Sequence, residues 1–393
     1  MIISCTCCTS GEKLDANDPV TVTINGIVQS LNEQFIPDRR VNRLDVEVAE
    51  HHSTIVLRGE TTLPTAKAIL LTELDSLGIT YQDSILEMPA AYLGDENYAL
   101  TRHAVVNLRS APGHSQELAT QLLLGTPVRV LKQEGNWCFV QCPDGYLAWL
   151  NEGELVRMTA TDLDLWKQAQ RYFYVNDYGY SYTKPNTESE KVGDLAKGGL
   201  LVKTGEENGY YQLVYPDGRQ AYVPRDQLAD FGQWLNANPL SFANTQTFAK
   251  QQLGKPYLWG GTSPKAMDCS GFTKTVYWQQ GLIIPRDASQ QVHAGLNVEF
   301  DENLNGLKAG DFLFFGRYRE DGSEKVTHVG IYLGDGSFIH SGADNGANSI
   351  ENLLPEKEGY ADHRRQSLLR AKRLQEGSAG VVSIEEHPWY SSL

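Results

Sequence analysis

Hydrophobic and polar positions along the 393-residue chain change their period several times, which predicts several domains that combine helices and strands. Residues 19–90 begin with the alternating stretch VTVTI, typical of a strand, and continue with the strand-like STIVLRG. The next segment, LPTAKAILLTELDSLG, predicts a helix that ends at Gly78, and a strand-like ITYQDSILEM follows it. We therefore expect a small α/β domain here. The apolar stripe of its helix comprises Ala66, Ile69, Leu70, Leu74 and Leu77.

An internal repeat follows this domain. NWCFVQCPDGYLAWL at residues 136–150 aligns without a gap with GYYQLVYPDGRQAYV at residues 209–223, and the offset is 73 residues, as from Asp144 to Asp217. Each copy contains short alternating strands separated by Gly, Pro and Asp-Gly turns. We therefore predict two small open β-barrels, called repeat 1 and repeat 2 below.

The pattern changes again after residue 237, where two helices are predicted. Ser241 can cap a helix that continues to residue 253, before Gly254 and Pro256. In the second helix Asp268 is a suitable N-cap, Cys269 is the first helical residue, and Gly281 stands where a glycine commonly ends a helix. The apolar face of this helix comprises Cys269, Phe272 and Val276.

Cys269 therefore has two interpretations. A helix N-terminus lowers the pKa of a cysteine and can hold a developing oxyanion, which favours a nucleophile. Ser270 and Gly271 are small enough to let a substrate approach. The same residues are also compatible with a buried, inert cysteine on an apolar helix face. This segment alone does not decide between the two.

A nucleophile needs a base, and the segment KVTHVGIYLGDGSFIHSGA offers two histidines on a predicted β-hairpin with strands at residues 326–333 and 337–341. A three-residue loop pairs residues whose numbers sum to 670, so His340 faces Gly330. Side chains alternate with period two, so His328 and His340 then lie on one face, about 7–8 Å apart at Cα. A two-residue loop would shift the register and place them on opposite faces.

In the same-face register, one imidazole can act as the base for Cys269 while the second orients it, as in a catalytic triad. Each histidine could instead be structural. Cys269, His328 and His340 could also bind zinc, but no glutamate is placed as in a known zinc-hydrolase motif. We therefore favour a thiol hydrolase without a metal.

The amino-acid composition limits which classes of binding partner and which cysteine pairings are expected. The chain has 34 Lys and Arg against 49 Asp and Glu, a formal net charge of −15, which does not favour a nucleic-acid backbone or an anionic membrane as a general partner. Cys138 and Cys142 are four residues apart in a predicted strand, about 13 Å at 3.3 Å per residue, which is too far for a disulfide. We interpret both as strand packing.

The N-terminus leaves two interpretations open. MIISC lacks the basic and apolar regions of a signal peptide, so at face value the chain is not exported. However, residues 2–5 resemble the end of a bacterial lipoprotein signal, in which Cys5 would be the lipid anchor if the true start lies upstream. No run of about 18 apolar residues is present, so no transmembrane segment is predicted.

Several motifs together resemble one family. GKPYLWGG, DCSGFTKTVY, RDASQQ, KAGDFLFFG and THVGIYLGDGSFIHSG resemble the NlpC/P60 family of papain-like cysteine peptidases, which cut bacterial cell-wall peptides, over about residues 245–373. NLRSAPG, GTPVRVL and GYLAWL in repeat 1 resemble bacterial SH3 domains, and repeat 2 resembles them more loosely. The whole is similar to γ-D-glutamyl-L-diamino acid endopeptidases, also described as dipeptidyl-peptidase VI.

Carried over residue by residue, the resemblance implies that Cys269 is the nucleophile, His328 the base and His340 the orienting third member. It also implies that Tyr257 of PYLWGG lies near the oxyanion site. The substrate-binding residues that it implies are Tyr146, Trp259, Asp268, Ser270 and Asp287.

Two positions depart from the family pattern. RDAS at residues 286–289 lacks the hydroxyl that the family often has beside the aspartate. RSAP at residues 109–112 has no acid, whereas the family tends to supply one from this part of the first SH3 domain. The sequence therefore does not identify the residue of repeat 1 that would bind the amine of a substrate.

The resemblance implies a substrate with a free N-terminal L-alanine, whose amine pairs with a carboxylate such as Asp287, while Tyr146 closes the cleft beyond it. Stems still joined to the glycan would then be excluded. The bond cut would join γ-D-glutamate to meso-diaminopimelate or lysine, through an acyl-enzyme and without a cofactor. The alternatives are an N-acetylmuramoyl-L-alanine amidase that uses the same triad and a non-catalytic protein that binds cell-wall peptides.

We thus expect a multidomain α+β protein with a papain-like NlpC/P60 catalytic domain, two SH3-like small β-barrels and an N-terminal small α/β domain of unknown role. Its partners would be peptidoglycan stem peptides in the bacterial cell envelope, periplasmic or lipid-anchored, with a cytoplasmic location as the alternative. The expected limits are an N-terminal tail at 1–18, the α/β domain at 19–90, repeat 1 at 91–157, repeat 2 at 158–236 and the catalytic domain at 237–393.

Overall fold

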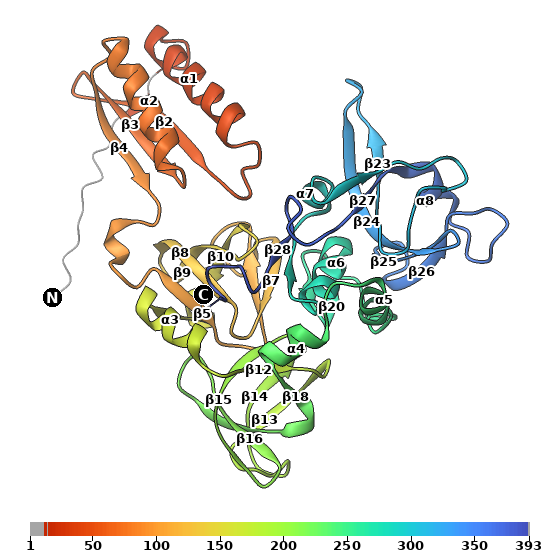
Figure 1. Ribbon diagram of the computed structural model, residues 1–393. Coiled ribbons are helices and arrows are strands. Elements are labelled where there is room, and N and C mark those ends of the chain that lie inside the picture. The colour runs from red at the N-terminus through yellow and green to blue at the C-terminus, as the bar shows by residue number, and fades with distance from the viewer. Residues whose placement is uncertain (1–11, 14, 392–393) are drawn as a thin grey trace. The chain divides into compact units, whose positions relative to one another are not determined.

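The computed structural model describes residues 12–13 and 15–391 (Figure 1). The chain forms two compact units with the boundary after Gly94, and each is described by itself. Cys5, the candidate lipid-anchor residue, lies outside the described residues. Within the described part of the chain, no helix combines the length and apolar character needed to cross a bilayer.

The N-terminal unit is an α/β domain, as predicted. Its sheet has the order β1-β2-β3-β4, and helix α2 connects the parallel strands β3 and β4. Both helices share one apolar core with the sheet, to which Ile24, Leu57 and Leu70 contribute fully buried side chains. The elements are β1 (Glu12–Lys13), α1 (Pro19–Phe35), β2 (Leu44–His51), β3 (Thr54–Thr61), α2 (Pro64–Ser76) and β4 (Tyr81–Glu87).

Two local predictions in this unit are wrong. VTVTI belongs to helix α1, because Asp18 accepts hydrogen bonds from the amides of Val20 and Thr21, and Pro19 is preorganised for the first helical turn. The apolar residues that follow repeat with the helical period, and this longer pattern overrides the short alternation. Leu77, expected on the buried stripe of α2, is 58 % exposed because it lies at the helix end.

The second unit begins with the two repeats, whose strands agree one for one with the offset of 73 residues. The strand order within residues 98–158 is β11-β5-β8-β9-β10-β6-β7, and the order within residues 171–230 is the equivalent β18-β12-β15-β16-β17-β13-β14. The strands of repeat 1 are β5 (Tyr98–Thr101), β6 (Val105–Arg109), β7 (Leu118–Leu123), β8 (Pro127–Glu134), β9 (Trp137–Gln141), β10 (Leu147–Asn151) and β11 (Leu155–Met158). Those of repeat 2 are β12 (Arg171–Tyr174), β13 (Tyr178–Tyr182), β14 (Lys191–Ala196), β15 (Leu200–Glu207), β16 (Tyr210–Val214), β17 (Gln220–Pro224) and β18 (Leu228–Asp230).

Short helices connect these parts. Helix α3 (Ala160–Gln168) follows repeat 1 and starts with a capping box between Thr159 and Asp162. Helix α4 (Phe231–Ala237) follows repeat 2, and the ring of its Trp234 stacks on Phe173 with 4.6 Å between centroids. The Trp234 indole also donates to the carbonyl of Gln279 at 3.0 Å, which ties repeat 2 to the remaining part of the unit.

The remaining part packs helix α6 (Cys269–Trp278) against an antiparallel sheet of order β22-β27-β23-β24-β25-β26 (Figure 1). Phe272 and Val276 of α6 share a buried cluster with Phe314 and Ile331 of the sheet. The other helices are α5 (Phe242–Lys250), α7 (Ala288–Gln291) and α8 (Asp362–Ser367). The strands are β19 (Thr262–Ser263), β20 (Ala266–Met267), β21 (Leu282–Ile283), β22 (Leu296–Val298), β23 (Phe312–Tyr318), β24 (Glu324–Gly334), β25 (Ser337–Gly342), β26 (Ala347–Asn352), β27 (Leu368–Arg373) and β28 (Val382–Ser383).

The predicted caps of both helices are present. The Ser241 hydroxyl accepts from the Asn244 amide at 3.1 Å at the start of α5, although the helix ends at Lys250, earlier than expected. Helix α6 ends at Trp278, and Gly281 follows with a left-handed φ of 72°. A helix that begins at Cys269 and packs on the sheet of the histidine hairpin is the expected papain-like arrangement.

Candidate active site

Cys269 begins helix α6, as predicted. The Asp268 carboxylate caps the helix by accepting a hydrogen bond from the Gly271 amide at 2.7 Å. Gly271 also has a packing role, because a Cβ there would lie 1.9 Å from the carbonyl oxygen of Gly261. The glycine lets the loop before β19 pack directly on the first turn of the helix, and its role in admitting substrate stays a prediction.

The surroundings of the Cys269 thiol favour its neutral form. Burial raises the pKa of the thiol to about 12, and the charge of Asp268 raises it as well. The backbone amides of Val329 and Ser270 and the charge of Arg286 lower the pKa of Cys269, but by less. The expected lowering by the helix N-terminus is therefore outweighed by burial, so the thiol needs a base. Val329 directly follows His328 on β24, which brings that strand beside the sulfur.

The histidine hairpin has the predicted register, but a different turn produces it. Tyr332 pairs with Phe338, in agreement with the expected sum of 670. Gly334 then pairs with Ser337, so the turn itself has two residues, and a bulge between Tyr332 and Gly334 absorbs the extra one. The bulge keeps both histidines on one face, where a plain two-residue turn would have separated them.

His328 and His340 contact each other directly. The distance from His328 Nε2 to His340 Nδ1 is 2.8 Å, and the two ring planes are inclined at 85°. His340 lies opposite Gly330, since a Cβ on that glycine would come within 3.2 Å of the His340 Cβ. Burial lowers the pKa of His328 well below its ordinary value, and the positive charge of Arg364 lowers it further. His328 is therefore neutral at pH 7 and able to accept a proton.

The other side of the His340 ring faces a carboxylate that the sequence did not reveal. His340 Nε2 lies 3.2 Å from Glu351 Oε2. Ser349 of β26 pairs with His340 of β25, and Glu351 is two residues further along the same face. Burial raises the pKa of Glu351, but the nearby His340 and the hydrogen bond from Asn345 outweigh it and leave that pKa below the ordinary value. Glu351 is therefore ionised.

The described residues contain no group of three or more His, Cys, Asp or Glu side chains arranged to hold a metal ion. The hairpin histidines contact each other and Glu351 instead. The arrangement is that of a thiol beside the strand that carries a neutral imidazole, with a second imidazole and a carboxylate behind that imidazole.

Tyr257 lies close to this thiol. Its amide donates to the carbonyl of Gly346 at 2.9 Å, which fixes its loop beside the strand that carries Glu351. Burial raises the pKa of the Tyr257 phenol, and the charges of Cys269 and Asp268 act in the same direction. The hydroxyl therefore keeps its proton and can donate a hydrogen bond to a developing oxyanion.

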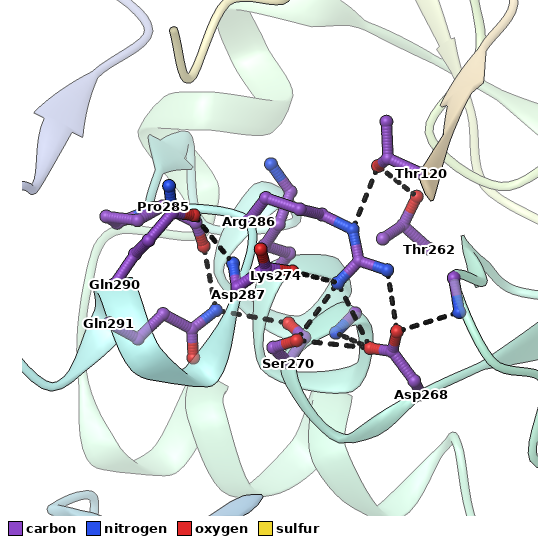
Figure 2. A network of polar contacts seen from close by, with 12 residues as sticks. Thr120, Thr262, Asp268, Ser270, Lys274, Pro285, Arg286, Asp287, Gln290 and Gln291 are labelled. Carbon is purple, nitrogen blue, oxygen red and sulfur yellow. Dashed lines mark hydrogen bonds and ion pairs between the residues drawn. The ribbon is translucent and has the colours of Figure 1, made fainter. Parts of the chain in front are cut away.

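A buried arginine binds the start of α6 to repeat 1 (Figure 2). The Arg286 guanidinium is 1 % exposed and contacts both Asp268 oxygens, at 3.1 and 2.6 Å. It also donates to the hydroxyl of Ser270 at 2.9 Å and, through Nε, to the Thr120 hydroxyl at 3.0 Å. Asp268 and Ser270, predicted to line the substrate subsite, are thus both bound to Arg286, and their subsite role stays a prediction.

Two further predicted residues lie next to this arginine. Asp287 precedes α7, and its side chain, 27 % exposed, has one oxygen 3.8 Å from Arg286. Tyr146 of repeat 1 is buried and lies near Arg286. Asp287 is the more accessible of the two, which suits a carboxylate that meets a ligand.

Repeat 1 forms a wall beside this site through three contacts. The Thr262 hydroxyl donates to the carbonyl of Gln121 at 2.6 Å. The indole of Trp259, 64 % exposed, donates to the Glu117 carboxylate at 2.7 Å. The third contact is an ion pair between Lys274 of α6 and the buried Asp144 of the Pro-Asp-Gly turn. These contacts bring strand β7 and the β9–β10 turn to the edge of the site.

Sequence reasoning missed three charged residues here. Arg286 stands beside the predicted Asp287, but nothing in the sequence indicates that its side chain turns back to Asp268. Glu351 could have been found by extending the strand pairing from His340 to the next strand, where it shares the histidine face. Glu117 follows RSAP, in which no acid was found, by only five residues.

Comparisons with known proteins match two parts of the second unit to described families. Residues 254–366 match the NlpC/P60 family, and residues 108–155 match the bacterial dipeptidyl-peptidase Sh3 domain. A gamma-D-glutamyl-L-lysine dipeptidyl-peptidase of Bacillus subtilis is 32 % identical over 236 residues, which cover 57 % of this chain and 72 % of that protein. A Bacillus cereus protein of the same name is 28 % identical over 300 residues, or 72 % of this chain and 85 % of that protein.

A solved structure shows the same fold. The crystal structure of an NlpC/P60 family protein from Bacillus cereus superimposes with a TM-score of 0.59 at 24 % identity. The match covers 71 % of this chain and all of that chain. The superimposed part of the chain is therefore larger than the span of either family match.

Proposed function

Because the chain belongs to the NlpC/P60 family and is a cysteine peptidase, we propose that it hydrolyses the bond between γ-D-glutamate and a diamino acid in peptidoglycan stem peptides. The diamino acid is meso-diaminopimelate or L-lysine, and the product is the dipeptide L-Ala-γ-D-Glu. The observation that carries the proposal is Cys269 at the start of α6, beside the strand of His328 and its partner His340.

In the proposed mechanism His328 accepts the Cys269 proton as the sulfur attacks the γ-carbonyl carbon of D-glutamate. The Tyr257 hydroxyl and the N-terminus of α6 stabilise the oxyanion. The protonated His328 then gives its proton to the amine of the diamino acid, which leaves. Water, deprotonated by His328, hydrolyses the thioester and restores the thiol.

The proposed specificity depends on a free N-terminal amine. Asp287 is the carboxylate that we assign to this amine, with Tyr146 and Trp259 around it. Repeat 1 limits the space beyond the dipeptide, since Thr120, Glu117 and Asp144 all contact the catalytic part of the unit. Stem peptides that remain attached to glycan would have neither the amine nor the space. Substrates are therefore released peptides in the bacterial cell envelope.

The test is turnover of L-Ala-γ-D-Glu-L-Lys and its diaminopimelate analogue, with products identified by mass spectrometry. We expect Cys269→Ala to lose at least about 10³-fold in kcat. Cys138→Ala, which removes another buried thiol, is the matched control and should retain activity. Equal rates for wild type and Cys269→Ala would refute the mechanism. With muropeptides that still carry muramic acid on the alanine as a second substrate, release of muramic acid would instead indicate an amidase.

The amine requirement has its own test. N-acetylation of the substrate should lower kcat/KM by about 10²-fold or more, because it leaves a partly buried carboxylate without its cation, which costs about 2–5 kcal/mol. The same substrate with a free amine serves as the control. Cleavage of the acetylated peptide at an unchanged rate would exclude recognition of the free amine.

A further inference from the structure

A carboxylate behind the histidine pair has no assigned role. Resting on the proposed function, because it concerns the same histidine pair, we propose that Glu351 is a positioning residue for catalysis. It fixes the tautomer of His340 and, through it, leaves Nδ1 of His328 free to act as the base. The conclusion follows from the order of donors and acceptors along Glu351, His340 and His328.

The first step concerns Glu351 and His340. Glu351 Oε2 is buried and has no partner in hydrogen-bond geometry among the described residues, and its nearest neighbour at ion-pair distance is His340 Nε2, at 3.2 Å. The other carboxylate oxygen accepts a hydrogen bond from the Asn345 amide at 2.8 Å. An ionised carboxylate accepts hydrogen bonds and donates none, so when the His340 ring is neutral its one proton belongs on Nε2.

The second step concerns His328, whose tautomer depends on that of His340. With the proton on Nε2, His340 Nδ1 carries a lone pair and can only accept. His328 Nε2 lies 2.8 Å from that nitrogen and must therefore donate to it. A neutral imidazole carries one N–H, so Nδ1 of His328 is left without a proton. This is the form that can deprotonate Cys269, and the opposite tautomer of His340 would place a proton on this nitrogen and abolish the base.

Ser349 is the competing partner for His340. Its hydroxyl lies 3.5 Å from His340 Nε2, further away than the carboxylate, and it already accepts from Asn345 at 2.9 Å. A hydroxyl can donate or accept and therefore selects neither tautomer. Glu351 is ionised, accepts a hydrogen bond from Asn345 and lies 3.9 Å from Arg364. Glu351 is therefore the group that selects the tautomer of His340.

The substitution Glu351→Gln separates positioning from packing, because glutamine has the same shape. The Asn345 amide donates to the oxygen at Oε1, so the glutamine carbonyl takes that place and its NH₂ group faces His340 Nε2. An NH₂ group there demands the other tautomer of His340. We therefore expect Glu351→Gln to lose about 10²-fold in kcat with KM nearly unchanged, since the base is both unprotonated less often and poorly oriented.

Three variants complete the kinetic experiment on the full chain. Glu351→Ala removes the carboxylate without supplying a donor, so it should lose less activity than Glu351→Gln. Ser349→Ala should lose less than about threefold, and a loss equal to that of Glu351→Gln would make Ser349 the orienting partner instead. Glu324→Gln is the matched control, because Glu324 is a similarly shielded strand carboxylate that pairs with Arg370 at 2.6 Å, and it should retain full activity. Full activity of Glu351→Gln would overturn the proposal.

A measurement without any kinetics makes the same test on the wild type. In ¹⁵N-histidine-labelled protein, the nitrogen shifts of both rings should report a protonated Nε2 and an unprotonated Nδ1 at pH 7. Single replacements of His328 and His340 assign the signals. In Glu351→Gln the pattern of His340 should reverse. A protonated Nδ1 on His340 in the wild type would overturn the proposal even if a variant did not fold.

The two claims fail in different ways. Activity that survives Cys269→Ala refutes the proposed mechanism, whatever the state of Glu351. If Cys269→Ala is inactive while Glu351→Gln is as active as the wild type, the peptidase function stands and only the role of Glu351 is refuted.

Discussion

Repeats 1 and 2 share every strand and the strand order, yet they meet the rest of the unit in different ways. Thr120 on β7 of repeat 1 contacts the buried Arg286, whereas the equivalent position in repeat 2 is Gly193, which has no side chain. Gln121 of repeat 1 binds Thr262 beside the site. Its equivalent, Asp194, makes an exposed ion pair with Lys265.

The Pro-Asp-Gly turn occurs in both repeats, but its aspartate contacts the catalytic part of the unit only in repeat 1. Asp144 of repeat 1 pairs with Lys274 of α6, which carries the cysteine. Asp217 of repeat 2 pairs with Arg219 at 2.8 Å and with Arg102 of repeat 1 at 3.2 Å. Repeat 2 therefore supports repeat 1, and repeat 1 contacts the site. The same backbone can serve either purpose, and a few side chains on one sheet edge decide which.

The largest expected difference between the repeats concerns their turn aspartates. Asp144→Ala leaves Lys274 without its carboxylate in a mostly buried place, which should lower the free energy of unfolding by about 3 kcal/mol and reduce kcat/KM. Asp217→Ala should cost about 1 kcal/mol, because its arginine partners are about one-third exposed. Urea unfolding and kinetics of both variants make the comparison. Equal losses of activity would contradict the division of roles.

A smaller difference in activity between the repeats is expected when a buried hydroxyl is removed from each. Thr120→Val removes the acceptor of Arg286 Nε, and Ser181→Ala in repeat 2 removes a 2.7 Å hydrogen bond to the Tyr215 hydroxyl. Each should cost about 1–3 kcal/mol of unfolding free energy. Only Thr120→Val should lower kcat/KM, since Arg286 holds the start of α6. Loss of activity in Ser181→Ala at a temperature where it is folded would argue for a direct role of repeat 2.

The smallest expected effects come from replacing the equivalent glutamates of the two repeats. Glu117 accepts from the exposed Trp259, and its counterpart Glu190 is exposed on repeat 2. Both changes to glutamine should leave the unfolding free energy within about 0.5 kcal/mol of wild type. Glu117→Gln should raise KM for the free-amine peptide a few-fold, and Glu190→Gln should not. Identical Michaelis constants would remove Glu117 from the substrate wall.

Much of this architecture could be predicted from the sequence, because it depends on local pattern. The repeat offset predicted all the equivalent strands, and the Asp268 cap predicted where α6 begins. The histidine register was also predicted correctly, although the bulge that produces it was not. VTVTI was misassigned because five alternating residues weigh less than a capped helix of 17 residues.

The charged connections could not be predicted, since they depend on segments far apart in the chain. Arg286 meets Thr120 across 166 residues, and Lys274 meets Asp144 across 130. The pKa of Cys269 was expected to fall at a helix N-terminus, but burial of the thiol raises it to about 12. Burial of this kind is a tertiary property that motif and spacing do not report.

The most direct test of the central claim is to trap the acyl-enzyme. Wild-type protein mixed with L-Ala-γ-D-Glu-L-Lys, quenched in acid within the first turnover and digested, should carry an L-Ala-γ-D-Glu adduct on the peptide that contains Cys269. The Cys138 and Cys142 peptides of the same digest are internal controls and should be unmodified. An adduct on another residue, or turnover by Cys269→Ala at the wild-type rate, would contradict the account.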